Sequence, residues 1–129
     1  MTRRTGPDPE TVITLLTRCA GCCEVCGKPL SGRRGYAWSV HHRRGRDGKP
    51  DSHQPQNLLV VCGADNSTGC HGRIHQHAKT ESEPNGWWIS RIAVANDPLT
   101  IPVLVGHGSR WVYLTATGEY ADNPPEVTR

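Results

Sequence analysis

The stretch that decides the fold spans residues 41–77 and reads HHRRGRDGKPDSHQPQNLLVVCGADNSTGCHGRIHQH. It holds six of the seven histidines of the chain, and the seventh, His107, lies well outside it. His71 and His75 are four residues apart, so on a helix their side chains share one face and can reach one ion. A histidine of the pair that opens the stretch, expected at the end of a strand, would face them. The stretch therefore predicts a cluster of imidazoles built from a strand and a helix.

The pattern around the histidines predicts two strands, a long loop and a helix. In residues 36–41, Tyr, Trp and Val alternate with Ala, Ser and His, which is typical of a strand. Residues 43–56 are rich in Gly, Pro and charge and predict a loop. The apolar run at 57–61 predicts the second strand, and residues 68–79 predict the helix.

Cysteines occur both before this region and within it. Cys23 and Cys26 form a C-x2-C pair followed by Gly27, the arrangement of a metal knuckle. Cys19 and Cys22 have the same spacing and compete for the role, but Cys19 also fits the apolar stripe of a helix.

A second pair farther along the chain, Cys62 and Cys70, brings the expected zinc ligands to four. Thiolates from two separated segments can close a tetrahedral site. The expected ligands of this structural zinc are Cys23, Cys26, Cys62 and Cys70.

Composition explains why such a site is expected. The 129 residues include only 35% hydrophobic ones and no Phe, too little for a large core, and small domains of this kind recruit disulfides or a metal. There is no apolar leader after Met1 and no run long enough to cross a membrane. We therefore expect a cytoplasmic location, no membrane partner and reduced thiols, which favours metal over disulfides.

Positive charge is concentrated beside the histidines. Residues 28–49 contain seven Lys and Arg residues against one acid, a surplus of six, while the whole chain carries a net +3. This run predicts a polyanionic partner such as nucleic acid, and the alternative is a solvated basic loop. The expected phosphate contacts are Arg43, Arg44 and Arg46.

The flanking segments are simpler. Asp8 followed by Pro9 predicts the start of a short packing helix. Residues 101–105 and 110–115 predict a β-hairpin, and the polar tail from residue 117 onward is expected to be frayed. The aromatic residues expected to form a small satellite core, or alternatively a DNA-contacting surface, are Trp87, Trp88 and Trp111.

Together these patterns predict a small α+β fold in three segments: an N-terminal arm and helix (1–21), a zinc-braced core (22–82) and a short β-rich C-terminal extension (83–129).

Four motifs occur in one order: CEVCG (23–27), VHHRR (40–44), NLLVVC (57–62) and GCHGRIH (69–75). Over about residues 22–79 they resemble the HNH endonucleases, whose core is the ββα-metal fold, and in particular the small HNH proteins of actinobacterial phages. The resemblance implies a role for each matching residue: His42 as general base, Asn57 as the residue that holds the loop and the base, and His41, His71 and His75 as metal ligands.

Alternative roles stay open for several of these residues. A one-residue error in strand register would exchange the roles of His41 and His42. Asn57 can be a simple turn residue, while His53 and His77 are expected to face solvent.

The resemblance implies a metal-dependent endonuclease that hydrolyses DNA phosphodiester bonds, nicking one strand at each site. Imidazole ligands suit Mn²⁺, Ni²⁺, Co²⁺ or Zn²⁺ better than Mg²⁺ as the single catalytic cation. DNA is the expected partner, with phage packaging proteins such as terminase, in the cytoplasm of a bacterial host. The alternatives are a zinc-braced nucleic-acid-binding module and a packaging adaptor without catalysis.

Overall fold

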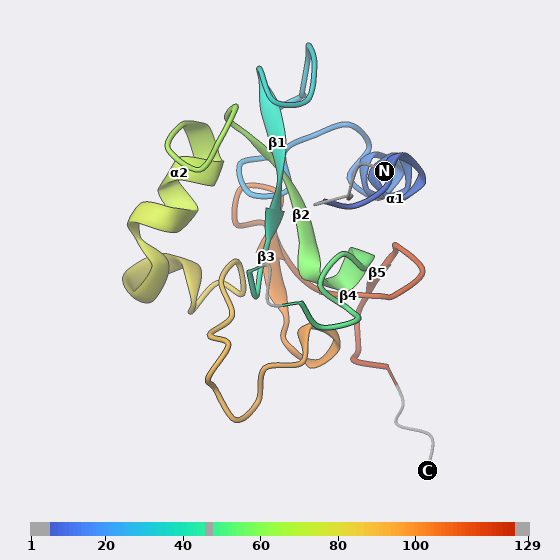
Figure 1. The fold of residues 1–129 in the computed structure, drawn as a ribbon, viewed down its shortest axis with the longest axis vertical. Coiled ribbons are helices and arrows are strands. Elements are labelled where there is room, and N and C mark those ends of the chain that lie inside the picture. Colours follow the sequence, from blue (N-terminus) through green and yellow to red (C-terminus); the bar gives the residue numbers. More distant parts are fainter. Residues whose placement is uncertain (1–5, 46–47, 126–129) are drawn as a thin grey trace.

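A computed structural model describes residues 6–45 and 48–125 of the chain. It confirms the small α+β fold, with a few helices and two small antiparallel sheets (Figure 1). Its elements are α1 (Pro9–Arg18), β1 (Trp38–His42), η1 (Pro55–Asn57), β2 (Leu58–Cys62), α2 (Gly69–Gln76), the π-helical η2 (Ala78–Ser82), η3 (Pro98–Thr100), β3 (Val103–Val105), β4 (Arg110–Leu114) and β5 (Tyr120–Ala121). Within the described ranges, no helix has both the length and the apolar character needed to span a membrane.

Strand β2 is the centre of the molecule because it is buried on both faces. It pairs antiparallel with β1, so that His41 lies opposite Leu59. Leu58 and Val60 pack toward α1, whereas Leu59 and Val61 pack toward α2 and the second sheet. Figure 1 shows α1 and α2 on opposite sides of this hairpin. Full burial of an aliphatic side chain contributes about 1.5–3 kcal/mol, which explains the continuous apolar run.

Helix α1 begins where the sequence predicts. The Asp8 carboxylate accepts a hydrogen bond from the Thr11 N–H at 2.8 Å, and Pro9 occupies the first helical position. Val12 and Leu15 are buried against Trp38 on β1. The helix therefore covers one face of the hairpin.

The C-terminal extension covers the other face. β3 and β4 form the expected hairpin, and β5 adds a third strand by pairing Tyr120 with Leu114. The expectation of a frayed tail is therefore wrong for residues 120–121. Trp87 packs in the same core as Ile74 of α2, but Trp111 is 52% exposed. The prediction that Trp111 belongs to a small core with the other two tryptophans is therefore wrong. This core joins residues on both sides of the expected boundary at residue 83, and the boundaries themselves stay a prediction.

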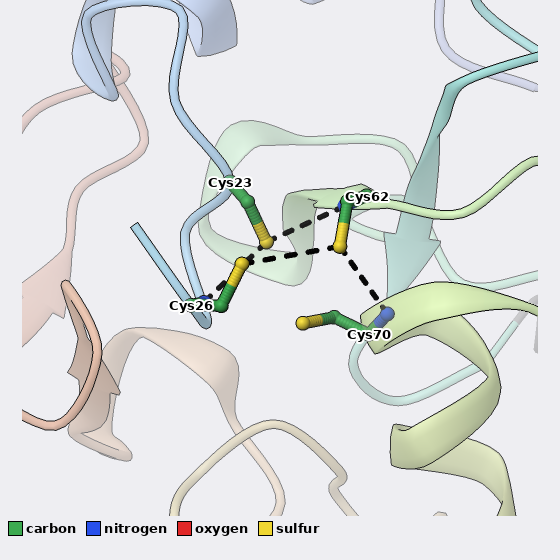
Figure 2. A group of neighbouring side chains, drawn as sticks. All are labelled: Cys23, Cys26, Cys62 and Cys70. Atoms are coloured by element: carbon green, nitrogen blue, oxygen red, sulfur yellow. Dashed lines mark hydrogen bonds between the residues drawn. The ribbon is translucent and has the colours of Figure 1, made fainter. Parts of the chain in front are cut away.

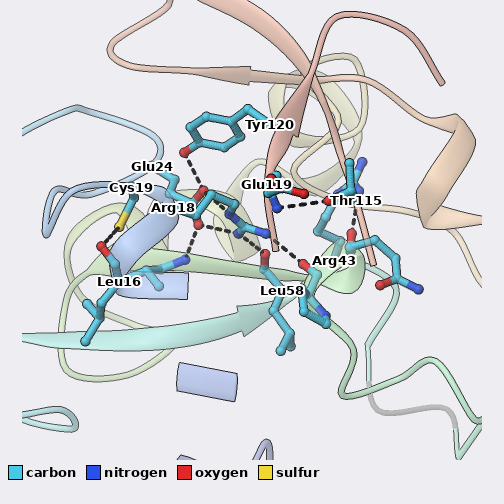
Figure 3. Close-up of polar contacts among 12 residues, drawn as sticks. Leu16, Arg18, Cys19, Glu24, Arg43, Leu58, Thr115, Glu119 and Tyr120 are labelled. Carbon is cyan, nitrogen blue, oxygen red and sulfur yellow. Dashed lines mark hydrogen bonds and ion pairs between the residues drawn. The ribbon is translucent and has the colours of Figure 1, made fainter. Parts of the chain in front are cut away.

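A buried ion pair ties four parts of the chain together (Figure 3). Arg18 donates to both carboxylate oxygens of Glu24, at 3.0 and 2.7 Å, and both side chains are fully buried. The carboxylate also accepts the Val60 N–H at 2.8 Å and the Tyr120 hydroxyl at 2.6 Å. Burial, together with the adjacent carboxylate, raises the pKa of Tyr120, so its hydroxyl stays a donor. Glu24 thus links the cysteine knuckle to α1, β2 and β5.

Arg43 has a structural role. Its side chain is 1% exposed, and burial lowers its pKa to about 9. The guanidinium donates to four backbone carbonyls, those of Gln56, Gly86, Pro98 and Ile101. The prediction that Arg43 contacts phosphate is therefore wrong, because its donors hold the C-terminal extension against the hairpin.

The other two predicted phosphate contacts have different outcomes. Arg44 is 3% exposed and forms an ion pair with Asp51, so a phosphate would have to compete with that carboxylate, and the contact stays a prediction. Arg46 lies outside the described residues.

Glu24→Ala should lower the free energy of unfolding by about 3–5 kcal/mol, because Arg18 would be left as an uncompensated buried charge. Urea unfolding followed by circular dichroism measures the change. Glu83→Ala is the matched control, since Glu83 forms an exposed ion pair with Lys79 and its loss should cost less than about 1 kcal/mol. Equal losses in the two variants would contradict a structural role for the buried pair.

Candidate metal centres

Four cysteine sulfurs converge between the knuckle after α1, the end of β2 and the first turn of α2 (Figure 2). Gly27 adopts φ 79°, which allows the turn after Cys26 to close. The Sγ atoms of Cys23, Cys26, Cys62 and Cys70 all lie within 4.8 Å of one another. Those of Cys26 and Cys62 are 3.9 Å apart, and a tetrahedral zinc with bonds of about 2.3 Å sets its sulfurs about 3.8 Å apart. The four cysteines could therefore hold a structural zinc ion.

Hydrogen bonds favour negative charge on these sulfurs. The N–H groups of Cys26 and Cys62 donate to Cys23 Sγ at 3.5 and 3.4 Å, and the Cys70 N–H donates to Cys62 Sγ at 3.4 Å. The Cys70 thiol and these N–H groups lower the pKa of Cys23 to about 5. The pKa of Cys70 is raised, because its thiol donates to Cys23 and is desolvated. A cation would relieve the repulsion between neighbouring thiolates, so the donor set suits zinc.

The long spacing between Cys62 and Cys70 closes because the intervening loop folds back on itself. A Cβ on Gly63 would lie 2.0 Å from the Thr68 carbonyl oxygen, and one on Gly69 would lie 2.7 Å from that of Cys62. Both glycines also have positive φ, 106° and 58°. Only glycine allows this close approach, and it returns Cys70 to the end of β2.

The competing cysteines lie outside the cluster. Burial raises the pKa of Cys19 to about 11, and its thiol donates to the Leu16 carbonyl at 3.7 Å. The Cys22 thiol donates to the Ala20 carbonyl at 3.6 Å. The preference for Cys23 and Cys26 as the knuckle pair is therefore confirmed.

Three imidazoles form a second cluster, the histidine cluster. His41 comes from β1, while His71 and His75 lie one turn apart on α2. One nitrogen of each ring lies within 4.8 Å of the others, and the ring centroids are 5.2–5.4 Å apart. The strand alternation that places His41 toward α2 also places Ser39 there. These three residues could hold a cation, as the sequence predicted.

The protein fixes the tautomers of two of these rings. The Trp87 carbonyl lies 2.7 Å from His41 Nε2, and because a carbonyl only accepts, the proton must be on Nε2 and the lone pair on Nδ1. The Ser39 hydroxyl donates to the Gly63 carbonyl at 2.7 Å, so its oxygen accepts the Nδ1 proton of His71, also at 2.7 Å. The lone pair of His71 is therefore on Nε2. Such orientation of metal-ligating histidines by outer hydrogen bonds is the usual pattern.

Burial favours the neutral form of two of these rings, His41 and His75. Desolvation lowers the pKa of His41 well below its usual value, although the Trp87 carbonyl opposes the shift. Desolvation also lowers the pKa of His75. Because only a neutral imidazole offers a lone pair to a cation, these two shifts favour the ligating form of His41 and His75.

His42 lies beside the cluster and contacts a histidine of the following loop. Its Nε2 lies 2.9 Å from His53 Nδ1, with the rings nearly perpendicular at 73°. His53 is half-buried and His77 is exposed. Neither is among the three histidines of the cluster, in agreement with the expectation that they face solvent rather than metal.

Asn57 holds the loop that connects β1 and β2. Its side-chain oxygen accepts the Arg44 N–H at 3.0 Å, and its amide donates to the Ser52 carbonyl at 3.0 Å. It is fully buried. These bonds tie Asn57, at the end of the loop, to Arg44 at its start and to Ser52 within it. Asn57 is therefore more than the simple turn residue that the sequence left open.

The histidine cluster opens into a depression of about 590 Å³, called the histidine depression below. His41, His42, His71 and His75 all line it, together with Trp88 and Arg34. The sequence offered Trp88 only as a satellite-core or DNA-contacting residue, and it placed neither Trp88 nor Ser39 beside the histidines. It also did not predict the contact of His53 with His42. Ser39 could have been found, because it precedes His41 by two residues on the same strand face.

Comparison of the chain with family models, curated proteins and solved structures gives no match. The interpretation of the two clusters therefore depends on their geometry and donor chemistry.

Cys26→Ser should reduce zinc content from about one ion per chain to near zero and unfold the domain, because binding energy at a structural zinc site is folding energy. Metal analysis and thermal unfolding check this. Cys22→Ser, one residue from the knuckle pair but outside the cluster, should retain both zinc and stability. Full stability of the zinc-free protein would contradict the role assigned to the four sulfurs.

Ser39→Ala should weaken cation binding at the histidine cluster about 10- to 100-fold, the range found when an outer hydrogen bond to a ligand is lost. Calorimetric titration of the zinc-loaded protein with Ni²⁺ measures the affinity. Ser109→Ala, an exposed serine on the C-terminal hairpin, should bind Ni²⁺ like the wild type. If both variants bind alike, Ser39 does not set the tautomer of His71.

Proposed function

We propose that the chain is a metal-dependent DNA endonuclease of the HNH type, with β1, β2 and α2 as a ββα-metal core. The observation that carries the proposal is the histidine cluster: three imidazoles, from a strand end and from one helix face, converge on one point beside a fourth histidine in the same depression. Neutral nitrogen donors of this kind suit transition-metal cations.

The tautomers assigned above support the fit to a cation. Hydrogen bonds to Ser39 and to the Trp87 carbonyl leave lone pairs on His71 Nε2 and His41 Nδ1. His75 completes the set from the next helical turn. A divalent cation bound there would act as a Lewis acid on a phosphate oxygen and stabilise the departing 3′ oxygen.

His42 is proposed as the general base. When its Nε2–H donates to His53 Nδ1, at 2.9 Å, the lone pair is on His42 Nδ1, which can take a proton from water. His53 is then a positioning residue that selects this tautomer. The pairing parallels the orientation of a catalytic imidazole by a third group.

Asn57 is proposed to position the base indirectly. Because its amide spans the loop from Arg44 to Ser52, it keeps His53 within reach of His42. Loss of Asn57 would free the loop and misplace the partner of the base without removing any group that reacts.

Charge favours DNA as the substrate. Arg34 lines the histidine depression, and the chain carries a net positive charge of +3. Among the described residues, Asp65 is the one carboxylate on its lining, and it accepts hydrogen bonds from Ser67 in the turn before α2. Phosphate contacts supply most of the affinity for DNA. Packaging proteins such as terminase stay a proposal for its partners.

A zinc-braced module that binds nucleic acid without cleaving it is the second candidate. The cysteine cluster favours it, because the four sulfurs could brace the fold without any cation at the histidines. The two candidates differ in whether the protein cleaves DNA and whether that cleavage requires His42.

His42→Ala should lower the rate of supercoiled-plasmid nicking in Mn²⁺ by about 10² to 10⁴, the contribution of a positioned general base, with zinc content and thermal unfolding unchanged. His77→Ala, an exposed histidine that follows α2, is the matched control and should nick at the wild-type rate. Wild-type protein that nicks in none of Mn²⁺, Ni²⁺, Co²⁺, Zn²⁺ or Mg²⁺ would favour the binding module. If the His42→Ala variant nicks at the wild-type rate, His42 is not the general base.

A further inference from the structure

A second depression adjoins the histidine depression. It measures about 380 Å³ and is lined by the segment after η2, including Trp88, Arg91 and Ile92. Gly45 and Trp88 line both depressions, so the two hollows are neighbours. We call this second hollow the Trp88 depression.

Trp88 forms the wall shared by the two depressions. On the side of the histidine depression, its ring lies 6.2 Å from that of His41, nearly parallel to it, and 5.1 Å from that of His75. Neither histidine lines the Trp88 depression. The indole N–H groups of Trp38 and Trp87 donate to backbone carbonyls, but within the described ranges Trp88 donates its indole proton to no acceptor. An aromatic surface and a hydrogen-bond donor therefore stand beside the cation ligands.

The charge in the Trp88 depression favours an anion. Arg91 is exposed and, among the described residues, its guanidinium has no carboxylate partner. Its side chain lies along Gly45, where an added Cβ would be 3.9 Å from its Cδ. The other cation there, Arg44, is neutralised by Asp51, and no carboxylate lines this hollow in the described part of the chain.

Apolar contacts complete the hollow. Ile89 is buried at its base, while Ile92 is 94% exposed at its edge. The lining thus combines an exposed isoleucine, a half-buried tryptophan and the cation of Arg91. Nucleobases in single strands are bound by this combination of an aromatic platform and a backbone cation.

We infer that the Trp88 depression is a base-binding subsite, in which an unstacked nucleobase lies against Trp88 and its phosphate contacts Arg91 while the adjoining phosphodiester reaches the histidine cluster. This inference rests on the proposed nuclease function and adds a substrate class to it: single-stranded or locally unpaired DNA. Bases inside a duplex are stacked on both faces and cannot reach a protein aromatic ring without leaving the helix.

Binding by the full-length, zinc-loaded protein without any added catalytic cation tests the subsite directly. Fluorescence anisotropy compares a dye-labelled single-stranded oligonucleotide with its duplex. Wild type should bind the single strand more tightly, and Trp88→Leu should weaken that binding at least about 10-fold, within the range for loss of one base–aromatic stack. Trp88→Phe should retain most of the affinity because it retains an aromatic face, and Arg91→Ala should weaken it.

The matched controls are Trp111→Leu and Arg110→Ala, exposed residues of β4 that line neither depression. Both should bind the single strand like the wild type, and all five variants should keep the wild-type zinc content and remain folded under the assay conditions. Wild-type protein that binds the duplex as tightly as the single strand, or Trp88→Leu that binds the single strand like the wild type, would overturn the inference.

A parallel cleavage assay in Mn²⁺ separates the two proposals. Selective, Trp88-dependent binding of single strands with no cleavage supports the subsite and contradicts only the nuclease. Cleavage that depends on His42 but keeps the same ratio of single-strand to duplex rates in Trp88→Leu overturns the subsite and leaves the nuclease standing.

Discussion

Four cysteine sulfurs join the end of β2 to the first turn of α2, and the geometry of the candidate site follows from that junction. Cys70 immediately precedes His71, so fixing its sulfur beside Cys62 also fixes the start of the helix that carries two imidazoles. The knuckle at Cys23 brings Glu24 with it, and the buried carboxylate attaches the same junction to α1 and β5. One cluster thus organises both sides of the hairpin.

The hairpin supplies the other half of the site through its alternation. Residues of β1 that face α1 pack in an apolar core, and those that face α2 carry polar groups. Ser39 and His41 are on this second side, where each side chain donates a hydrogen bond to a backbone carbonyl. Buried polar groups need such partners. Here the partners also decide which ring nitrogen of two histidines faces the cluster, so packing and cation chemistry depend on the same bonds.

Much of this arrangement could be predicted from the sequence, because it depends on local spacing. The four cysteine ligands, the i, i+4 histidines, the start of α1 and the C-terminal hairpin all follow from short-range patterns. The buried role of Arg43 could not be predicted, since its carbonyl partners meet only when the C-terminal extension folds onto the hairpin. The same is true of Trp88, which lies in a segment without regular structure, and of His53, whose contact crosses a loop.

We propose that the sulfur cluster and the imidazole cluster are two separate metal sites in one small core. Anomalous X-ray scattering from crystals of the zinc-loaded protein soaked in Mn²⁺ tests it most directly. We predict a zinc peak enclosed by Cys23, Cys26, Cys62 and Cys70, and a separate manganese peak bounded by the three imidazoles. Cysteines paired as disulfides, or a histidine cluster with no manganese density, would contradict the claim.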